Sequence, residues 1–567
     1  MVALSQDLRS GENHADHRGG KRGGALVSAI MSRFFLVLLL AFGLAAPAAA
    51  QQAPLPRIVS EDGRHALLVD GKPYLILGGQ ANNSSNYPAV LPKVWPTIRA
   101  LHANTLEIPV AWEQVEPVEG QFDFSWLDAL VPQARENNVR LVLLWFGTWK
   151  NTSGSYVPEW VKADGRRFPR MRTREGKTHY VHSPHGRATL EADKRAFVAM
   201  MRHLREIDPQ HTVIMVQPQN EVGSYGSPRD FSPEANRLFE GPIPAELARK
   251  MGKRGTWSEV FGAKADSSFN AWYTARYIDE IAAAGQAELN LPMYVNVVVT
   301  DPFDPKAGEG GGASGGADWP VLDVWKAAAP HIAMAAPDLY DRPYRVYNAK
   351  LDKMARADNP LFVPETGNDM DFARYFWLAL GKGAIGWAPF GMDPTYSNHP
   401  LGGKDLADNL DAFASKFALM RPIAGDWARL AFEHPTVGFA KGEDASEQTA
   451  TLGRWTIKAQ YALWSFGDPS WTFMEFPPHP NKDRPVGGAA LIQLGPDEFL
   501  LAGSDVRIGF AQSAPREGDT VHFLSVEEGT FENGRWVMSR RWNGDQTDYG
   551  LNLTNPTLLK VRLGTYR

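Results

Sequence analysis

The chain contains no cysteine among its 567 residues. Disulfide bonds, thiolate metal sites, a cysteine nucleophile and a lipidated N-terminal cysteine are therefore excluded. The chain also lacks any long run of basic residues, and its 59 basic and 64 acidic side chains give a formal net charge of −5. Nucleic acid is not an expected partner, because the neutralisation of phosphates needs concentrated Lys and Arg.

No apolar run is long enough to span a bilayer comfortably. The most pronounced run, Phe34–Ala46, precedes the small-residue segment Ala48–Ala50. This arrangement is typical of a signal peptide cleaved before Gln51, with a signal anchor as the alternative. We expect residues 1–50 to be an upstream extension and a signal peptide, with translation starting at Met31. The mature protein is then periplasmic or secreted, with no stable membrane insertion after cleavage.

The composition is that of an ordinary globular protein that is rich in aromatic side chains. Hydrophobic residues make up 44% of the chain, charged residues 22% and aromatic residues 11%, including 18 Trp. These values show no bias toward disorder, and the length allows a large domain together with a smaller one. Trp stacks well on the apolar faces of sugar rings but is also a large core residue, so this richness is compatible with sugar binding without proving it.

Short apolar runs alternate with amphipathic helical stretches between Tyr74 and Ala388. The expected strands are Tyr74–Gly78, Thr105–Val110, Arg140–Trp145, Thr212–Gln217, Met293–Val299, Ile332–Pro337, Leu361–Pro364 and Ala384–Ala388. The expected helices are Leu91–His102, Ser125–Asn137, Leu190–Glu206, Ser268–Ala284, Val321–Ala328, Tyr344–Arg356, Asp369–Leu380 and Leu406–Met420. Continuously apolar strands are typical of parallel sheets buried on both faces. Eight strand–helix units predict an α/β fold, a (β/α)₈ TIM barrel over residues 51–422, with a doubly wound open sheet as the alternative.

Three long connections follow predicted strands, over residues 146–189, 220–267 and 300–319. Loops that follow strands line the C-terminal mouth of a barrel, where active sites lie. The Gly-rich stretch 308–316 lacks the Lys-Ser or Lys-Thr ending of a phosphate loop. We expect it to be a plain connector, with a flexible lid as the alternative.

The pattern changes after about Pro422. Short alternating runs separated by turn signals recur at Ala489–Leu494, Glu498–Ala502, Arg507–Phe510 and Val521–Glu527. We therefore predict an antiparallel β-rich domain over residues 423–567, arranged as a sandwich. The sequence leaves its role open between bracing the barrel, adding a loop to the site and supporting a dimer.

Two glutamates follow buried strands of the predicted barrel. Glu221 lies in VIMVQPQNEVGSYG directly after the fourth strand, and Glu365 lies in LFVPETGND after the seventh. Cleavage of a glycosidic bond needs one carboxyl group to protonate the leaving oxygen and another to attack or to activate water. Either residue alone could be a surface charge at a strand end, but together they would face each other across one barrel mouth.

The segment Trp95–Trp160 narrows the class further. It contains WPTIRALHANTLEIPVAWEQVEPVEGQFDFSWLDAL and LVLLWFGTWKNTSGSYVPEW. Together with the Asn-Glu pair, it resembles the clan A β-galactosidases of glycoside hydrolase families 35 and 42. These share the Trp-Glu-x-x-Glu-Pro-x-x-Gly-x-Phe-Asp-Phe pattern found here at Trp112 to Phe124. The bacterial branch of family 35 with a β-rich C-terminal domain is the better match. Family 42 enzymes often carry a cysteine-bound zinc, which a chain without cysteine cannot hold.

The resemblance covers roughly residues 74–400 and implies a retaining enzyme that removes terminal β-linked galactose from oligo- or polysaccharides. It assigns Glu221 as the acid/base and Glu365 as the nucleophile, with carboxyl groups about 5–5.5 Å apart. Galactosylated xyloglucan is the kind of substrate that the branch suggests. Lys150-Asn151-Thr152 departs from the family, which has an acidic residue near a Gly-Gly pair in this loop, and this puts the sugar and its linkage in question.

Several other side chains at strand ends are candidates for binding sugar, each with a structural role as the alternative. Asn220 is expected to donate to the 2-hydroxyl group of the sugar, and Trp387 to form the floor under the ring. The remaining candidates are Asn82, Glu113, Lys150, Asn151, Trp149 and Tyr340.

Other functions remain open at this stage. Another clan A β-glycosidase (an arabinosidase, mannanase or glucanase) is one alternative, and a non-catalytic carbohydrate-binding barrel is another. The expected partner is a carbohydrate substrate, and a homo-oligomer is one of the open oligomeric states. We expect no cofactor and no catalytic metal. His179, His182 and His185 match no known ligand frame and are expected to be solvated loop residues along the cleft.

Overall fold

The computed structural model describes residues 54–395, 406–461, 473, 481 and 483–567. The expected signal peptide lies outside these residues. Within them, no helix combines the length and the apolar character needed to cross a membrane.

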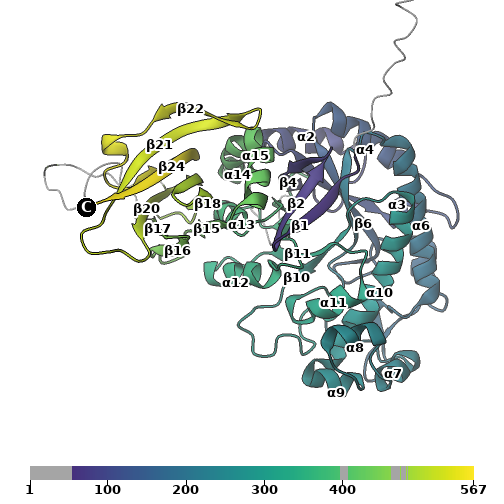
Figure 1. Cartoon of the computed structure of the whole chain (residues 1–567). Coiled ribbons are helices and arrows are strands. Elements are labelled where there is room, and N and C mark those ends of the chain that lie inside the picture. Colours follow the sequence, from purple (N-terminus) through teal and green to yellow (C-terminus); the bar gives the residue numbers. More distant parts are fainter. Residues whose placement is uncertain (1–53, 396–405, 462–472, 474–480, 482) are drawn as a thin grey trace, which may run out of the picture. The chain divides into compact units, whose positions relative to one another are not determined.

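Eight parallel strands form the wall of a barrel, coloured purple to green in Figure 1. They are β4 (Ile76–Gln80), β5 (Thr105–Ala111), β6 (Arg140–Lys150), β9 (Val213–Asn220), β10 (Tyr294–Val298), β11 (Met334–Leu339), the interrupted strand β12 (Phe362–Val363) and β13 (Glu365–Thr366), and β14 (Gly386–Trp387). Strand β14 pairs with β4, and the pairing continues through β5 and β6 to β9. On the other side, β10 pairs with β11 and β11 with β13.

Two junctions complete the ring. Between β9 and β10 a parallel bridge joins Val216 to Met293, and the N–H of Val216 donates to the carbonyl of Pro292 at 3.1 Å. The seventh strand is interrupted at Pro364, which has no N–H to donate. Its first half, β12, pairs with β14 and its second half, β13, pairs with β11. The closed ring confirms the predicted (β/α)₈ barrel and excludes the open sheet.

At least one helix follows each barrel strand, as the alternation predicts. These helices are α2 (Leu91–Ala100), α4 (Ser125–Glu136), α6 (Arg187–Ile207), α10 (Ala265–Glu288), α11 (Leu322–Ala328), α12 (Tyr344–Met354), α13 (Tyr375–Gly381) and α14 (Leu406–Met420). Asp369–Leu380 was expected to be one helix, but its first part is the 3₁₀ helix η3 (Met370–Arg374). The loops carry further short elements: α3 (Trp112–Val115), α5 (Glu159–Ala163), β7 (Arg170–Arg172), β8 (Thr178–His182), α7 (Pro233–Glu240), α8 (Ala245–Met251) and α9 (Trp257–Phe261).

A small antiparallel sheet that the sequence did not predict precedes the barrel. It consists of β1 (Arg57–Glu61), β2 (Arg64–Val69) and β3 (Lys72–Tyr74). Leu67 and Val69 of β2 pack in one buried cluster with barrel side chains such as Tyr294 and Met334. The barrel interior is therefore filled partly from outside the strand wall. Tyr74, expected in the first barrel strand, belongs to β3 instead.

Two antiparallel sheets follow α15 (Ala424–Glu433) and confirm the predicted β-rich C-terminal region, green to yellow in Figure 1. In spatial order, one sheet contains β15 (Thr436–Ala440), β18 (Gly488–Gly495), β19 (Glu498–Ser504), β24 (Thr557–Tyr566), β21 (Thr520–Glu532) and β22 (Arg535–Arg541). The other contains β16 (Gln448–Leu452), β17 (Trp455–Gln460), β20 (Val506–Gln512) and β23 (Leu551–Leu553). Apolar side chains of both sheets, including Trp455 and Phe499, form one buried cluster. The exact boundary at residue 422 stays a prediction.

The helix α13 and the strand β15 approach each other closely through two glycines. A methyl group on Gly381 would lie 2.0 Å from the backbone nitrogen of Gly438, and one on Gly438 would lie 2.7 Å from the carbonyl oxygen of Trp377. The hydroxyl of Thr436 donates to the carbonyl of Gly381 at 2.9 Å. Glycine is needed at this contact because the two backbones touch, so no side chain fits between them.

We predict that Gly381→Ala lowers the free energy of unfolding by about 1–3 kcal/mol, because the added methyl group must push two backbones apart. Urea unfolding measures the change. The matched control is Gly165→Ala, whose methyl group would meet no atom within 4 Å; a change below about 0.5 kcal/mol is expected there. Equal stability of the two variants would contradict the prediction.

Candidate active site

Glu221 is held by its backbone at the end of β9. Its φ is +42°, and that of Gln219 is +70°; this left-handed region is costly for residues other than glycine and is found mainly where the surrounding structure enforces it. The N–H of Glu221 donates to Oδ1 of Asn296 at 2.9 Å, and its carbonyl accepts from the N–H of Thr152 at 3.0 Å. The backbone of Glu221 is therefore held by one contact from β10 and one from the loop after β6, which fix the direction of its side chain.

The segment after Glu221 is pinned by the Gly-rich stretch 308–316. Ser224 and Ser314 form an antiparallel bridge with two backbone hydrogen bonds of 2.9 and 3.1 Å. Gly223 has a φ of +127°, and a methyl group there would lie 2.6 Å from the carbonyl oxygen of Ala313. This part of the stretch, expected to be a plain connector, also packs directly against the loop that carries Glu221.

Glu365 is the first residue of β13 and is bonded through both carboxylate oxygens. The hydroxyl of Tyr340 donates to Oε1 at 2.6 Å, and Nε2 of Gln80 donates to Oε2 at 3.0 Å. Two donors on one carboxylate stabilise its ionised form and fix its orientation. Glu365 is thus positioned as a buried carboxylate with a defined direction.

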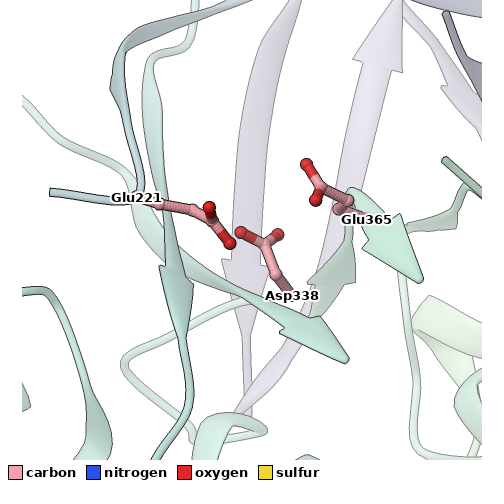
Figure 2. A group of neighbouring side chains, drawn as sticks. All are labelled: Glu221, Asp338 and Glu365. Atoms are coloured by element: carbon pink, nitrogen blue, oxygen red, sulfur yellow. The ribbon is translucent and has the colours of Figure 1, made fainter. Parts of the chain in front are cut away.

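A third carboxyl group, Asp338 of β11, lies between the two glutamates (Figure 2). The parallel register pairs Asp338 with Glu365 on neighbouring strands. One carboxylate oxygen from each of Asp338, Glu221 and Glu365 lies within 4.8 Å of the other two. The two predicted glutamates therefore do converge at the barrel mouth, and they share it with an aspartate.

Burial and mutual repulsion set the charge of this group. Burial raises the pKa of Glu221 to about 7; the charge of Glu365 adds to the rise, and that of Lys150 opposes it. Burial likewise raises the pKa of Asp338 well above its ordinary value, with the charge of Glu365 as the next cause. Burial and the neighbouring Glu365 also raise the pKa of Tyr340, so its hydroxyl remains a donor. The site thus favours few negative charges at neutral pH.

Asn220 is completely buried beside the cluster. Neither its side-chain oxygen nor its side-chain nitrogen has a hydrogen-bond partner among the described residues. Leaving both ends of a buried amide unpaired costs free energy unless a ligand or solvent satisfies them. Asn220 is therefore available to bind a polar group that enters the site.

Lys150 lies next to the same strand end, since it pairs with Asn220 across β6 and β9. Its ammonium donates to the side-chain oxygen of Asn151 and lies 5.1 Å from the ring centroid of Phe146. The charge of Lys150 acts on Glu221. The structure thus brings Lys150 to the cluster, whereas Asn151, which is exposed, contacts it only through the lysine.

Asn82 and Glu113 are already committed to protein partners. The Nδ2 of Asn82 donates to the Oδ1 and carbonyl oxygen of Asp393 at 3.0 and 3.1 Å, which ties the end of β4 to the loop after β14. Glu113 forms an ion pair with Lys162 at 2.8 Å and is 35% exposed. Their contacts give both residues structural roles, although Asn82 keeps a buried oxygen without a partner among the described residues.

Two tryptophans expected at the sugar are core residues. Trp387 is fully buried and packs against Phe376, Phe413 and Phe417, with its N–H directed to the hydroxyl of Tyr347 at 3.4 Å. It offers no exposed face, so the expected floor under the sugar is wrong in this conformation. Trp149 is also buried, because it packs against Tyr277 and donates to the carbonyl of His182 at 3.2 Å.

His182 differs from the solvated loop histidine that was expected. It is fully buried, and neither ring nitrogen has a partner among the described residues. Burial lowers its pKa to about 4, so the ring is neutral. His179, by contrast, is partly exposed, and its Nε2 lies 3.0 Å from the carbonyl oxygen of Tyr225. Within the described part of the chain, the histidines belong to no group that could hold a metal.

Two tyrosines near Glu221 were missed by the sequence analysis. Tyr180 and Tyr225 are each 43% exposed. The hydroxyl of Tyr180 lies 2.6 Å from that of Thr152, the residue whose N–H binds Glu221. Burial and the charge of Glu221 raise the pKa of Tyr225 to about 12. Tyr180 lies in the short strand β8 and Tyr225 in the loop after β9, where periodicity gives no usable signal.

Asp338 and Gln80 could have been found from strand periodicity. Side chains alternate along a strand, so residues two apart point to the same face. Asp338 is two residues before Tyr340, and Gln80 is two before Asn82; both of these later residues were candidates. Asn296 carried no comparable signal, because its neighbour Val298 is an ordinary apolar strand residue.

Known sequences that resemble the chain indicate its class. Residues 92–286 match the glycoside hydrolase family 42 model described as "Beta-galactosidase", and residues 413–554 match a domain of unknown function, DUF5597. A β-galactosidase of Xanthomonas manihotis is 28% identical over 209 residues, which are 36% of this chain and 32% of that protein. Beta-galactosidase 11 of Arabidopsis thaliana is 31% identical over 129 residues, which are 21% of this chain and 15% of that protein. The chain thus spans a third or less of these relatives.

Solved structures that resemble the chain include two β-galactosidases. That of Rahnella sp. R3 has a TM-score of 0.44 and 14% identity, and covers 64% of this chain and 60% of its own. That of Bacillus circulans sp. alkalophilus has a TM-score of 0.46 and 9% identity, and the match covers 86% of this chain and 99% of that one. The sequence match over residues 92–286 makes the barrel similar to glycoside hydrolases. More particularly, it is similar to β-galactosidases; membership of clan A and the choice of family 35 over family 42 stay predictions.

The raised pKa of Glu221 predicts a pH-dependent stability. An unfolded glutamate ionises near pH 4.5 and the folded one near pH 7, so the stability that the neutral carboxyl retains at low pH is lost as the pH rises between these values. Glu221→Gln removes this loss. Its stability relative to the wild type should grow by at most about 3 kcal/mol from pH 4.5 to pH 7 and then stay level.

Urea unfolding at several pH values measures this difference. Glu246→Gln is the control, because Glu246 is exposed on α8; its difference from the wild type should not change over the same range. A stability difference for Glu221→Gln that is constant with pH would refute the assignment.

Proposed function

We propose that the protein hydrolyses terminal β-galactosides with retention of configuration, through a covalent galactosyl-enzyme intermediate. The observation that carries the proposal is the convergence of Glu221 and Glu365 at the barrel mouth, where one carboxylate oxygen of each lies within 4.8 Å of the other. Retaining glycosidases hold their two carboxyl groups about 5–5.5 Å apart, whereas inverting enzymes leave about 6.5–9.5 Å for a water molecule. The close approach therefore favours direct attack by a carboxylate.

The environments of the two glutamates support different roles. Glu365 accepts hydrogen bonds from Tyr340 and Gln80, which suits an ionised nucleophile. The pKa of Glu221 is about 7 because of burial, so this group carries a proton below neutral pH and acts as a general acid. The two carboxyl groups therefore lie in different environments, as acid and nucleophile roles require.

The reaction follows from these roles. An oxygen of Glu365 forms a bond to the anomeric carbon while the bond to the leaving oxygen breaks, and Glu221 gives its proton to that oxygen. Glu221, now a carboxylate, takes a proton from a water molecule that attacks the same carbon and releases Glu365. We assign to Asn220 the binding of the sugar 2-hydroxyl group, and its unpaired buried amide supports this role.

Galactose as the sugar is supported by likeness to proteins named β-galactosidases. Lys150 at the cluster marks the point where this chain departs from them. A panel of nitrophenyl β-galactoside, β-glucoside, β-mannoside and α-arabinoside tests the choice. The β-galactoside should be cleaved fastest, and a higher kcat/KM for another sugar would replace galactose in the proposal.

We predict that Glu365→Ala lowers kcat by more than about 10⁴-fold, because the nucleophile is removed. In Glu221→Ala the loss should be about 10²–10⁴-fold for poor leaving groups and much smaller for dinitrophenyl galactoside, which needs no proton. Added azide tells the two roles apart. It should give the α-galactosyl azide with Glu365→Ala and the β-galactosyl azide with Glu221→Ala.

The control for these variants is Glu234→Ala, which removes an exposed carboxylate of α7 that pairs with Arg237. It should keep wild-type kinetics. Azide products of the same anomeric form from both variants would overturn the double displacement.

The leaving group should lie on the side of Tyr180 and Tyr225, since Glu221 must reach the leaving oxygen and both rings are half exposed beside it. Exposed aromatic faces stack on sugars. Tyr225→Ala should raise KM about tenfold for galactosyl oligosaccharides and change it little for nitrophenyl galactoside. The comparison of the two substrates measures this contact, and equal effects on both would contradict it.

A further inference from the structure

Asp338 is the one member of the carboxyl cluster to which the double displacement gives no role. It is 3% exposed and lies on β11 beside Glu365 of β13. Its Oδ2 accepts a hydrogen bond from Nδ2 of Asn296 at 2.8 Å. A buried carboxyl group beside two others is expensive to keep ionised, so its charge state decides what it can do in the site.

The second oxygen of Asp338, Oδ1, is buried and receives no hydrogen bond from the described residues. The carboxyl group of Asp338 lies next to that of Glu221 (Figure 2), and one oxygen of each lies within 4.8 Å of the other. Two carboxyl groups form a hydrogen bond only when one of them carries a proton, so this contact is favourable only with a neutral partner.

The surroundings indicate which of the two carries that proton more firmly. Asp338 has one donor, Asn296, and is closed off from solvent. Glu221 is partly exposed, and the ammonium of Lys150 acts on it. Ionisation is therefore easier on Glu221 than on Asp338.

Asn296 fixes the geometry of the pair. Its Oδ1 accepts from the N–H of Glu221 and its Nδ2 donates to Asp338, so one amide orients both residues. Oδ2 of Asp338 is occupied by this bond, whereas Oδ1 has no hydrogen-bond partner among the described residues.

We propose that Asp338 is a positioning residue that acts as a neutral carboxylic acid and donates a hydrogen bond to the Glu221 carboxylate. The inference rests on the proposed function and adds a residue to its machinery. When Glu221 gives its proton to the leaving oxygen, the new negative charge on Glu221 is met by the O–H of Asp338. Glu221 later regains a proton from water, and Asp338 keeps its own proton throughout.

Burial and the charges of Glu365 and Glu221 raise the pKa of Asp338, and its bond to Glu221 opposes the rise in the pKa of Glu221. The groups that face Glu221 are Asp338, Glu365, Lys150 and the hydroxyl of Tyr225. Asp338 thus makes Glu221 a stronger acid than burial alone would leave it. A negatively charged Asp338 would instead raise the pKa of Glu221. The direction in which the pKa of Glu221 changes when Asp338 is replaced therefore distinguishes the two charge states.

The test compares two variants by their pH profiles of kcat/KM. Asp338→Asn keeps a neutral donor, because its amide can accept from Asn296 and donate to Glu221; activity should stay within about threefold of the wild type, with the basic limb in place. Asp338→Ala removes the donor. Its kcat/KM for unactivated galactosides should fall about ten- to hundredfold, and its basic limb should move up by about one pH unit.

The direction of the shift separates the proposal from its opposite. If Asp338 were ionised, either variant would delete a negative charge and move the basic limb to lower pH, which would overturn the inference. Asp318→Asn is the control for a buried aspartate, since Asp318 accepts from the backbone N–H groups of Thr300 and Trp319, away from the cluster; its basic limb should not move. A smaller loss of Asp338→Ala activity on dinitrophenyl galactoside is also expected.

A readout without activity keeps the inference separate from the proposed function. The infrared difference spectrum of wild type minus Asp338→Asn at pH 8 should show a protonated carboxyl band. A carboxylate band in its place overturns the inference even if galactosides are cleaved, and failure to cleave any glycoside overturns the function alone. A rise in thermal midpoint with added Ca²⁺ in the wild type, absent from Asp338→Asn, would make the cluster a cation site and also overturn the inference.

Discussion

The burial of several carboxyl groups in one barrel mouth is the constraint around which this site is arranged. Repulsion between Glu221, Asp338 and Glu365 would be prohibitive if all three were ionised, so the protein must distribute protons and donors unequally. Donors from Tyr340 and Gln80 go to Glu365. Burial raises the pKa of the other two groups. In the proposed mechanism, acid and nucleophile are therefore distinguished by their hydrogen-bond partners as much as by their places in the chain.

This distribution depends on the strand register. The parallel pairing of β11 with β13 puts the carboxyl groups of Asp338 and Glu365 side by side. The strained turn at the end of β9 brings Glu221 to them. The Gly-rich stretch and the loop of β6 hold that turn from both sides. Long loops after the strands thus supply rigidity to the catalytic groups as well as walls for a substrate.

Much of the fold could be predicted from the sequence, because continuous apolar runs separated by helical periodicity are compatible with few architectures. The two glutamates could be predicted for a similar reason, since each follows such a run directly. Trp387 could not be assigned correctly: an aromatic residue at a strand end looks the same whether it faces a ligand or Phe413 and Phe417. Asp338 was overlooked because a single acidic residue in an apolar strand acquires meaning only from its neighbours across the sheet. The sheet β1–β3 was missed because its short strands resemble ordinary turns.

The closure of the barrel joins residues that are far apart in the chain. Ile76 of β4 pairs with Gly386 of β14, and Gln80 forms a bridge with Phe390 just beyond it. Gln80 is also the residue that binds Glu365. During synthesis, the segment that locks Gln80 in place emerges only after every other barrel strand has been made. Glu365 therefore acquires its full set of partners at the last step of assembly, and a chain that stops before β14 contains both glutamates without a finished site.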